Sequence, residues 1–181
     1  RQMCIRDRFK KGQPDTPIAI KDCPIAHPQI NTLMTNLRTE ILASETLKRK
    51  LFQVEFLSTL SGDNLITLIY HRPLDEPWQK QAKALEKKLN AAIIGRSRKQ
   101  KVVLSKDYVD EILAVDNKDF HYRQIEGGFT QPNAYINQHM LSWAKSQLHN
   151  SEGDLLELYC GNGNFTAVMA GEFKQVLATE I

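Results

Sequence analysis

Hydrophobic positions in the first two thirds of the chain follow two different spacings. Apolar residues recur every three or four positions in residues 28–43 and again in residues 75–89, which predicts two amphipathic helices. Shorter apolar runs bounded by glycine, asparagine or serine predict strands, and the Ser-Gly-Asp-Asn sequence at 61–64 predicts a hairpin turn. The expected strands are 18–20, 51–60, 65–70, 92–95, 101–104, 107–115 and 120–125.

Each of these helices carries one apolar stripe that we expect to face a core. On the second helix we interpret Trp78 as a core residue rather than a ligand contact. Phe52 and Phe56 lie four positions apart on one strand and are expected to share a face. The expected stripes are Ile30, Leu33, Met34, Leu37 and Ile41 on the first helix, and Trp78, Ala82, Leu85 and Leu89 on the second.

The pattern changes after Gly127 and Gly128. A helix is expected from Asn133 to residue 149, with Ile136, Met140, Leu141 and Ala144 facing inward. The apolar run at 154–159 predicts a buried strand, residues 165–170 a helix, and residues 175–180 a second strand. We therefore predict an α/β fold in two parts: an α+β domain at 9–126, then the first elements of a Rossmann-like domain at 127–181.

The turn after the first of these two strands has the features of a ligand site. Gly161 and Gly163 leave no Cβ in the way, so a ligand can approach bare backbone at the carboxyl end of a strand. Glu180 follows Gly163 at close to the spacing, about 20 residues, at which an acid on the next strand accepts hydrogen bonds from ribose hydroxyls. The pattern predicts a ligand that contains a ribose.

The loop also indicates which ribose ligand to expect. Thr166 stands where a dinucleotide fingerprint needs a third small residue, so a pyrophosphate is disfavoured. S-adenosylmethionine has a ribose and no phosphate, and it suits a two-glycine loop followed by the polar Asn164. An ordinary glycine turn of an α/β protein is the alternative.

Composition and charge narrow the class of protein. Of the 181 residues 41% are hydrophobic and 25% charged, as in globular domains, and no apolar run approaches the roughly 20 residues of a membrane-spanning helix. Three cysteines without a C-x-x-C pair fit a reducing compartment, so we expect a cytoplasmic protein. The formal net charge of the chain is +3. Residues 127–181 carry a net charge of −3, so residues 1–126 carry a net charge of +6.

The basic half contains a candidate RNA-binding surface. Arg96, Arg98 and Lys99 lie in a turn between two short strands, where they can contact phosphates, and Phe52 and His71 are candidates for stacking on bases. A solvated basic surface and a core position for Phe52 are the alternatives.

The glycine loop belongs to a longer motif with a specific resemblance. The sequence Glu157-Leu-Tyr-Cys-Gly-Asn-Gly-Asn-Phe-Thr166, preceded by Gly128-Phe-Thr-Gln-Pro-Asn133, resembles the bacterial tRNA (uracil-5-)-methyltransferase family. The similarity runs from about Ile18 to the last residue. It implies methyl transfer from S-adenosylmethionine to carbon 5 of a uridine in the T loop of tRNA, through a cysteine adduct. It also implies the tRNA T arm as partner and no metal, and we expect a monomer.

The resemblance assigns roles to individual residues. By motif position, Gln131, Tyr159, Asn164 and Glu180 correspond to family residues that contact S-adenosylmethionine. A helix-start cap is the alternative role for Gln131. The family also inserts an aromatic residue and a histidine into the T loop, which supports Phe52 and His71 as RNA contacts.

The resemblance also implies that the catalytic residues lie beyond residue 181. The family's nucleophile has a Ser-Cys-Asn-Pro-like context and its base is a late glutamate, and neither is found in these 181 residues. We expect the chain alone to be inactive, with apolar surface left uncovered around its last strands. Cys160 is interpreted as a packing residue.

The beginning of the chain calls for a separate interpretation. Residues 3–7 match the translation of a transposon end used in sequencing-library preparation, so residues 1–8, with Cys4, are expected to be non-native. A flexible native arm is the alternative.

The sequence leaves two alternative functions open. The first is an rRNA uracil-5 methyltransferase. Relatives with that activity bind an iron-sulfur cluster, and one of the ligands is a cysteine in a context like that of Cys23. We interpret Cys23 as structural, because it has no partner cysteines nearby. The second is a non-enzymatic RNA-binding module that retains the glycine loop.

Overall fold

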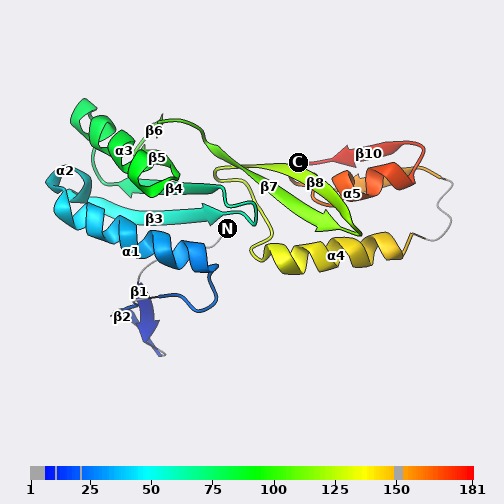
Figure 1. Cartoon of the computed structure of the whole chain (residues 1–181), viewed down its shortest axis with the longest axis horizontal. Helices are drawn as coiled ribbons and strands as arrows, with labels where there is room; N and C mark the ends of the chain where they lie inside the picture. The colour runs from blue at the N-terminus through cyan, green and yellow to red at the C-terminus, as the bar shows by residue number, and fades with distance from the viewer. Residues whose placement is uncertain (1–6, 11, 21, 149–152) are drawn as a thin grey trace. The chain divides into compact units, whose positions relative to one another are not determined.

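The computed structural model describes residues 7–10, 12–20, 22–148 and 153–181. These residues form two compact units. The first unit runs up to Ser58 and continues over Gly62–Val109, and the second consists of Thr59–Ser61 with Asp110–Ile181 (Figure 1). The prediction that residues 1–8 are non-native, Cys4 included, falls largely outside the described residues.

The first unit is built on a four-stranded sheet in the order β3-β4-β5-β6. Antiparallel pairs join β3 to β4 and β5 to β6, whereas β4 and β5 are parallel and connected through helix α3. A separate antiparallel hairpin, β1 with β2, precedes the sheet. The bounds are β1 Asp7–Lys10, β2 Gln13–Ala19, α1 Pro28–Ala43, α2 Glu45–Lys48, β3 Leu51–Ser58, β4 Asn64–Tyr70, α3 Glu76–Leu89, β5 Ala92–Ser97 and β6 Gln100–Val103.

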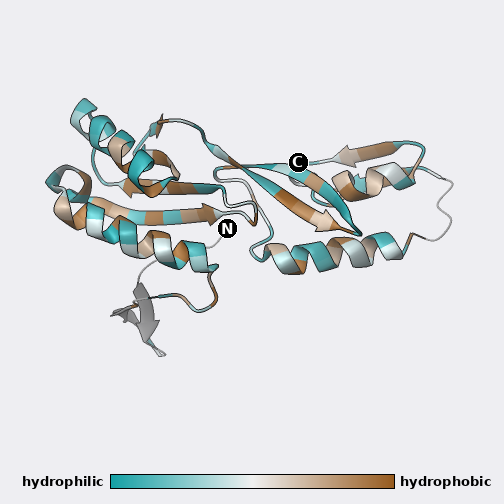
Figure 2. Cartoon of the chain, in the orientation of Figure 1, coloured by the Kyte–Doolittle hydropathy of each residue, from teal (hydrophilic) through white to brown (hydrophobic). Residues whose placement is uncertain are grey.

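Helices α1 and α3 pack against one face of this sheet and enclose the main core. Strand β4 is hydrophobic along most of its length and buried at nearly every position (Figure 2). Trp78 is completely buried there, which confirms its predicted core role. The stripe predicted for α1 is buried in full, as are Ala82 and Leu85 of the α3 stripe, and Leu89 packs partly buried against this core.

Gly95 allows β5 to approach α3 closely. A Cβ at this position would lie 2.3 Å from Cη2 of Trp78 and 2.5 Å from Cδ1 of Leu74, well inside van der Waals contact. Any larger residue would push strand and helix apart, because protein cores are close-packed. Gly95 thus fixes the path of the chain directly before the basic turn, which contains Arg96, Arg98 and Lys99.

The second unit begins with a hairpin and ends with a parallel strand pair. Asp116 and Asn117, which join β7 to β8, both have positive φ, as a two-residue type I′ turn requires. Strands β9 and β10 are parallel, with Leu158 opposite Thr179. The bounds are β7 Tyr108–Val115, β8 Lys118–Ile125, α4 Ala134–Ser146, β9 Leu155–Leu158, α5 Thr166–Met169, the 3₁₀ turn Ala170–Glu172 and β10 Val176–Thr179.

A small core holds this unit together, and it corrects the face predicted for α4. Leu141 is buried as expected, but Ile136 is 53% and Met140 37% exposed, so their predicted inward orientation is wrong. The buried row of the helix instead contains Asn137 and Leu141, four residues apart. The core residues are Leu113, Val115, Phe120, Tyr122, Leu141 and Val168.

Strand β9 is covered on one side only. Leu155 and Glu157 are half-buried, whereas Leu156 and Leu158 are exposed, so the prediction of a buried strand is wrong for this face. The expectation of uncovered apolar surface around the last strands is confirmed. The predicted domain boundary after residue 126 stays a prediction, since the division into compact units at Val109 concerns packing and not independent folding.

Glu111 is a buried carboxylate in the second unit. Its Oε1 accepts hydrogen bonds from the backbone N–H groups of Leu60, at 2.9 Å, and Ile112, at 3.0 Å. Burial is the dominant influence and raises the pKa of Glu111 above its ordinary value, despite these donors. Folding therefore shifts this carboxyl toward its protonated form, compared with the unfolded chain.

This burial predicts a pH dependence of stability. Because the folded pKa is raised, the contribution of Glu111 to stability is fully present below the ordinary glutamate pKa of 4.5 and is lost as pH rises through the folded pKa. Glu111→Gln keeps an acceptor oxygen and cannot ionise, so its free energy of unfolding should lack this decline. Urea unfolding of both proteins between pH 4 and pH 7 measures the difference. Parallel pH profiles would contradict the prediction.

Candidate functional site

The turn after β9 has the backbone conformation of an open ligand loop. Tyr159, Gly161 and Gly163 all have positive φ, and Tyr159 is 72% exposed. Glycine is favoured at 161 and 163 by this conformation rather than by crowding, because a Cβ at Gly161 would meet nothing within 4 Å. The turn is fixed by hydrogen bonds from the Cys160 N–H to the Thr179 carbonyl, at 3.0 Å, and from the Gly163 N–H to the Cys160 carbonyl, at 2.9 Å.

Glu180 lies directly beside this loop. The parallel register that sets Leu158 opposite Thr179 brings the next residue of each strand to the same edge of the sheet. There Oε2 of Glu180 accepts a hydrogen bond of 2.6 Å from the Gly161 N–H. The carboxylate and the glycine loop therefore form one arrangement, as their spacing in the sequence predicts.

Asn164 is held by two other elements of the second unit. Its side-chain amide forms a reciprocal pair with that of Asn137 on α4, with hydrogen bonds of 2.8 and 2.9 Å. Its backbone carbonyl accepts a 2.9 Å hydrogen bond from the Tyr122 hydroxyl on β8. Burial raises the pKa of Tyr122 to about 12, so this phenol remains a donor at neutral pH.

Gln131 precedes α4 and is half-buried. The N-cap of that helix is Asn133, whose Oδ1 accepts a 3.1 Å hydrogen bond from the Ile136 N–H, so the alternative role of Gln131 as the cap is not observed. Among the described residues, no hydrogen bond joins Gln131 to the glycine loop. Tyr159, Asn164 and Glu180 thus all lie at the loop, whereas Gln131 has no hydrogen bond to it among the described residues.

Sequence reasoning missed Asn137 and Tyr122. Both lie in the core of the unit and contact Asn164 through polar atoms. Asn137 shows a signal that could have been noticed: a polar residue four positions before Leu141, the one fully buried leucine of the helix. Tyr122 has no comparable signal, since a tyrosine in an alternating strand is ordinary core.

The candidate RNA surface of the first unit is centred on a stacked aromatic pair. The rings of Phe52 and His71 lie 4.2 Å apart between centroids, at an interplanar angle of 19°. Phe52 is 62% exposed, so it is not a core residue. The expectation that it shares a face with the buried Phe56 is wrong, because the register of β3 shifts between Leu51 and Gln53.

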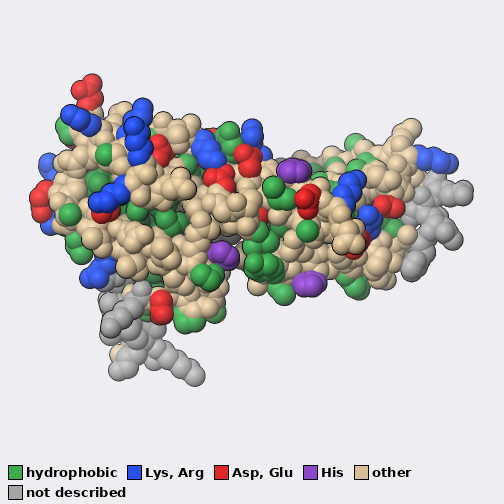
Figure 3. All heavy atoms as spheres, in the orientation of Figure 1, with side chains coloured by type: hydrophobic (Ala, Val, Ile, Leu, Met, Phe, Trp, Pro, Cys, Tyr) green, Lys and Arg blue, Asp and Glu red, His purple; other side chains and the backbone are tan. Residues whose placement is uncertain are grey.

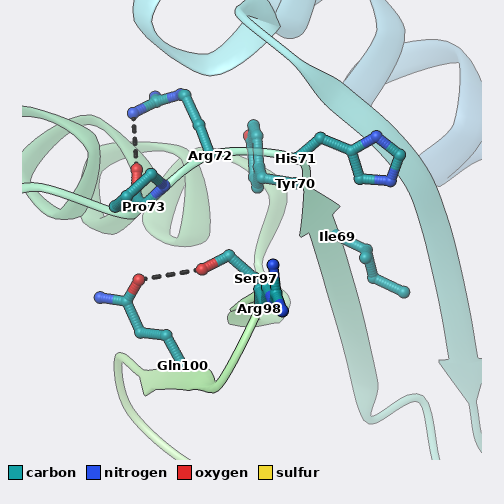
Figure 4. A pocket seen from close by; sticks show the side chains of 8 residues that line it. All are labelled: Ile69, Tyr70, His71, Arg72, Pro73, Ser97, Arg98 and Gln100. Carbon is teal, nitrogen blue, oxygen red and sulfur yellow. Dashed lines mark hydrogen bonds between the residues drawn. The ribbon is translucent and has the colours of Figure 1, made fainter.

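A cavity of about 670 Å³ lies beside His71 (Figure 4). Gln100 ties its two sides together: Oε1 accepts from the Leu74 N–H at 2.9 Å and from the Ser97 hydroxyl at 3.0 Å, and Nε2 donates to the Leu74 carbonyl at 3.0 Å. Arg98 lines the cavity and is exposed. The lining residues are Ile69, Tyr70, His71, Arg72, Pro73, Ser97, Arg98 and Gln100.

The arginine and lysine side chains near this cavity differ in exposure and in their contacts with the rest of the protein. Arg72 donates to the carbonyls of Thr46, at 2.7 Å, and Arg49, at 3.0 Å, so it supports the chain locally. Arg98 and Lys99 are exposed at the tip of the turn, and Arg96 is half-buried on β5. Figure 3 shows further Lys and Arg side chains around α3, with carboxylates between them.

Cys23 is buried, and its backbone N–H and carbonyl are hydrogen-bonded to the amide of Asn31, which fits its interpretation as structural. Over the described ranges, no three His, Cys, Asp or Glu side chains gather closely enough to hold a metal ion. None of the helices in the same ranges has the length and apolar character to cross a bilayer.

The fold and the loop define the class of the protein: an α/β chain whose second part opens a Rossmann-like methyltransferase fold. The same fold is found in the crystal structure of Pyrococcus abyssi tRNA (uracil-54, C5)-methyltransferase in complex with S-adenosyl-L-homocysteine. That structure matches with a TM-score of 0.68 at 15% identity, over 92% of this chain and 44% of that chain. The fold class expected from the sequence is confirmed.

Sequence comparison identifies the family. Residues 5–181 match the profile of the family described as tRNA (Uracil-5-)-methyltransferase. The tRNA/tmRNA (uracil-C(5))-methyltransferases of Aromatoleum aromaticum and Ectopseudomonas mendocina are each 56% identical over 173 residues, which is 96% of this chain and 47% and 48% of theirs. The chain belongs to the tRNA (uracil-5-)-methyltransferase family, and it spans about half the length of these relatives.

Proposed function

We propose that this chain is the RNA-binding part and the start of the cofactor-binding domain of an enzyme that methylates carbon 5 of a uridine in the T loop of tRNA. The observation that carries the proposal is the contact between Glu180 and the Gly161 N–H, which puts an acceptor for ribose hydroxyls at an open glycine loop. Membership of the family, and the names of the relatives, support the reaction and the substrate.

The residues around the loop fit S-adenosylmethionine. Glu180 offers its carboxylate to the ribose, and the exposed Tyr159 and the amide of Asn164 flank the position of the amino-acid end. Gln131 is assigned to the space between cofactor and base. When bound, the sulfonium of S-adenosylmethionine supplies the methyl group, and the residues of this chain bind and orient it.

The tRNA is assigned to the first unit. Phe52 and His71 present a stacked aromatic surface for an unpaired base, and Arg96, Arg98 and Lys99 provide positive charge for phosphates. The T arm is the expected contact region. The proposal includes a cytoplasmic, monomeric enzyme.

The proposed reaction needs two groups that these 181 residues do not supply by motif. A cysteine thiolate adds to carbon 6 of the uracil, which activates carbon 5 for methylation. A carboxylate then removes the proton from carbon 5, and the thiolate leaves carbon 6 as the 5,6 double bond forms again. Cys160 lies in the glycine loop, half-buried, and is not assigned to this step. We therefore propose that the 181-residue chain alone forms no 5-methyluridine.

The experiment is methylation of tRNA and rRNA transcripts by the whole enzyme with labelled S-adenosylmethionine. Label in a T-loop uridine of tRNA is the expected result, and a T-loop transcript with cytidine at that position is the control. If label is found only in rRNA, the substrate is rRNA and not tRNA. No label in either RNA would favour a non-enzymatic RNA-binding module.

The basic turn gives a separate prediction about RNA affinity. Changing Arg96, Arg98 and Lys99 together to glutamine should weaken tRNA binding by the whole enzyme and reduce the slope of log affinity against log salt concentration by about one per lost phosphate contact. Fluorescence anisotropy over a range of salt concentrations measures both. A triple glutamine variant at Lys80, Lys83 and Lys87, exposed on α3, is the matched control and should retain the parent slope. Equal slopes for the turn variant and the parent would remove the turn from the RNA surface.

A further inference from the structure

Asn137 is a polar side chain in the core of the second unit. It is 5% exposed and lies in the same buried row of α4 as Leu141. Burying an amide without partners is costly, so a buried asparagine is expected to have hydrogen-bond partners. Its partner is the amide of Asn164, 27 residues away in the sequence, and each of the two amides donates one hydrogen bond to the other.

The same loop residue is held a second time through its backbone. Tyr122, buried on β8, donates its hydroxyl proton to the Asn164 carbonyl. The side chain and the main chain of Asn164 are thus fixed by two elements, α4 and β8, which belong to the core of this unit. Phe165, the next residue, packs against that core as well.

These contacts fix one end of the glycine loop. Gly161 and Gly163 give the loop conformational freedom that must be lost when a ligand binds. The other end is fixed by β10, through the bond from Cys160 to Thr179 and the bond from Gly161 to Glu180. The anchor at Asn164 connects the chain directly after Gly163 to α4 and β8.

The reciprocal pair also sets how Asn164 meets a ligand. An asparagine amide has two N–H donors and an oxygen with two lone pairs, and the pair with Asn137 uses one donor and one lone pair of each amide. One N–H and one lone pair of Asn164 therefore remain for a ligand, in a fixed orientation. If Asn137 lost its amide, Asn164 could rotate.

We propose that Asn137 and Tyr122 are positioning residues of the cofactor loop: they hold Asn164 and Gly163 in the binding conformation without touching the cofactor. This inference rests on the proposed function of the loop. It predicts that loss of the contacts to Asn164 weakens cofactor binding and leaves the chemical step intact. The reason is that a disordered loop must be ordered when the cofactor binds, and the entropy cost of that ordering reduces the binding affinity.

The test compares variants of the whole enzyme, with S-adenosylhomocysteine as the probe. Asn137→Leu removes both amide bonds and should weaken calorimetric affinity about 5- to 50-fold, and Tyr122→Phe removes one bond and should weaken it about 2- to 10-fold. Both should raise KM for S-adenosylmethionine and leave kcat near the parent value. Amide exchange of residues 160–165 should be faster in both variants. Gln138→Leu, on the same helix and outside the pair, is the matched control.

Asn137→Asp gives a pH signature that a general loss of stability would not produce. The protonated carboxyl can donate to and accept from Asn164 as the amide does, whereas the carboxylate can only accept. Burial should raise the pKa of this carboxyl above its ordinary value, because position 137 is buried. Affinity of this variant should therefore rise toward the parent value as pH falls from 8 to 4, while the ratio of parent to Gln138→Leu stays constant. A pH-independent ratio of parent to Asn137→Asp would overturn the role of the reciprocal pair.

The outcomes separate this inference from the proposed function. If the parent does not bind S-adenosylhomocysteine, or Glu180→Ala binds it equally well, the proposed cofactor site fails and the inference with it. If Glu180→Ala binds weakly while Asn137→Asp and Tyr122→Phe match the parent in affinity and exchange, the inference alone is wrong. Should Asn137→Leu fail to fold, these two milder variants decide.

Discussion

Replacing Glu180 by alanine should weaken the affinity of the whole enzyme for S-adenosylhomocysteine by about 5- to 150-fold. The ribose hydroxyls lose a charged acceptor, which costs about 1–3 kcal/mol. The Gly161 N–H loses its 2.6 Å partner in the same variant, so the loop becomes less ordered as well. Titration calorimetry on the purified pair of proteins measures the change.

Two further variants separate the possible causes of that effect. Glu180→Gln keeps an oxygen that can accept from Gly161 and from a hydroxyl, so its affinity should lie between those of the parent and the alanine variant. Glu172→Ala removes another carboxylate of the same unit, one that forms an ion pair of 3.2 Å with Lys145, and should leave the affinity near the parent value. Equal affinity of parent and Glu180→Ala would remove Glu180 from the site.

Phe52→Ala should cost the whole enzyme about 1–3 kcal/mol in binding a T-arm stem-loop, which is the contribution of one base stacked on an aromatic ring. The ring is 62% exposed and already stacked on His71, so its removal also leaves the histidine unsupported. No charge is lost, and the salt dependence should match that of the parent, unlike in the variant of the basic turn.

The controls for this prediction use the same unit. Leu42→Ala removes an exposed apolar side chain on α1 and should bind RNA as the parent does. Phe52→Tyr keeps an aromatic ring and should retain most of the affinity. Anisotropy at two salt concentrations measures all three, and parent-like binding by Phe52→Ala would rule out base stacking at this position.

Local signals were sufficient to predict most helices of the fold. Helix α1 was predicted with its observed bounds, and α3 begins after Asp75, whose carboxylate caps the helix by accepting from the Trp78 N–H at 3.0 Å. Caps and apolar periodicity are properties of neighbouring residues, so they are visible in the sequence. The positions of β9 and β10 were predictable for the same reason, since the strands expected at 154–159 and 175–180 contain them.

The errors arose where a partner strand or a packing surface decides the outcome. The register shift beside Phe52 depends on how β3 pairs with β4, which no spacing within β3 reveals. Helix α4 carries apolar residues around much of its circumference, including the exposed Tyr135 and Trp143, so periodicity does not specify its buried face.

One part of the candidate site could be predicted from the sequence and another part could not. The loop glycines and Glu180 follow from spacing within one strand-loop-helix-strand unit, and the structure places them together. The anchor of Asn164 comes from residues 27 and 42 positions away, on α4 and β8. Such contacts are set by the packing of distant segments and leave little trace in a single sequence.

A crystal structure of the whole enzyme with S-adenosylhomocysteine would show whether the glycine loop and Glu180 bind the cofactor. We expect the ribose hydroxyls within hydrogen-bonding distance of the Glu180 carboxylate, with the amino-acid end beside Tyr159 and Asn164. A ligand bound elsewhere, with Glu180 still turned only to the Gly161 N–H, would contradict the assignment of this loop as the cofactor site.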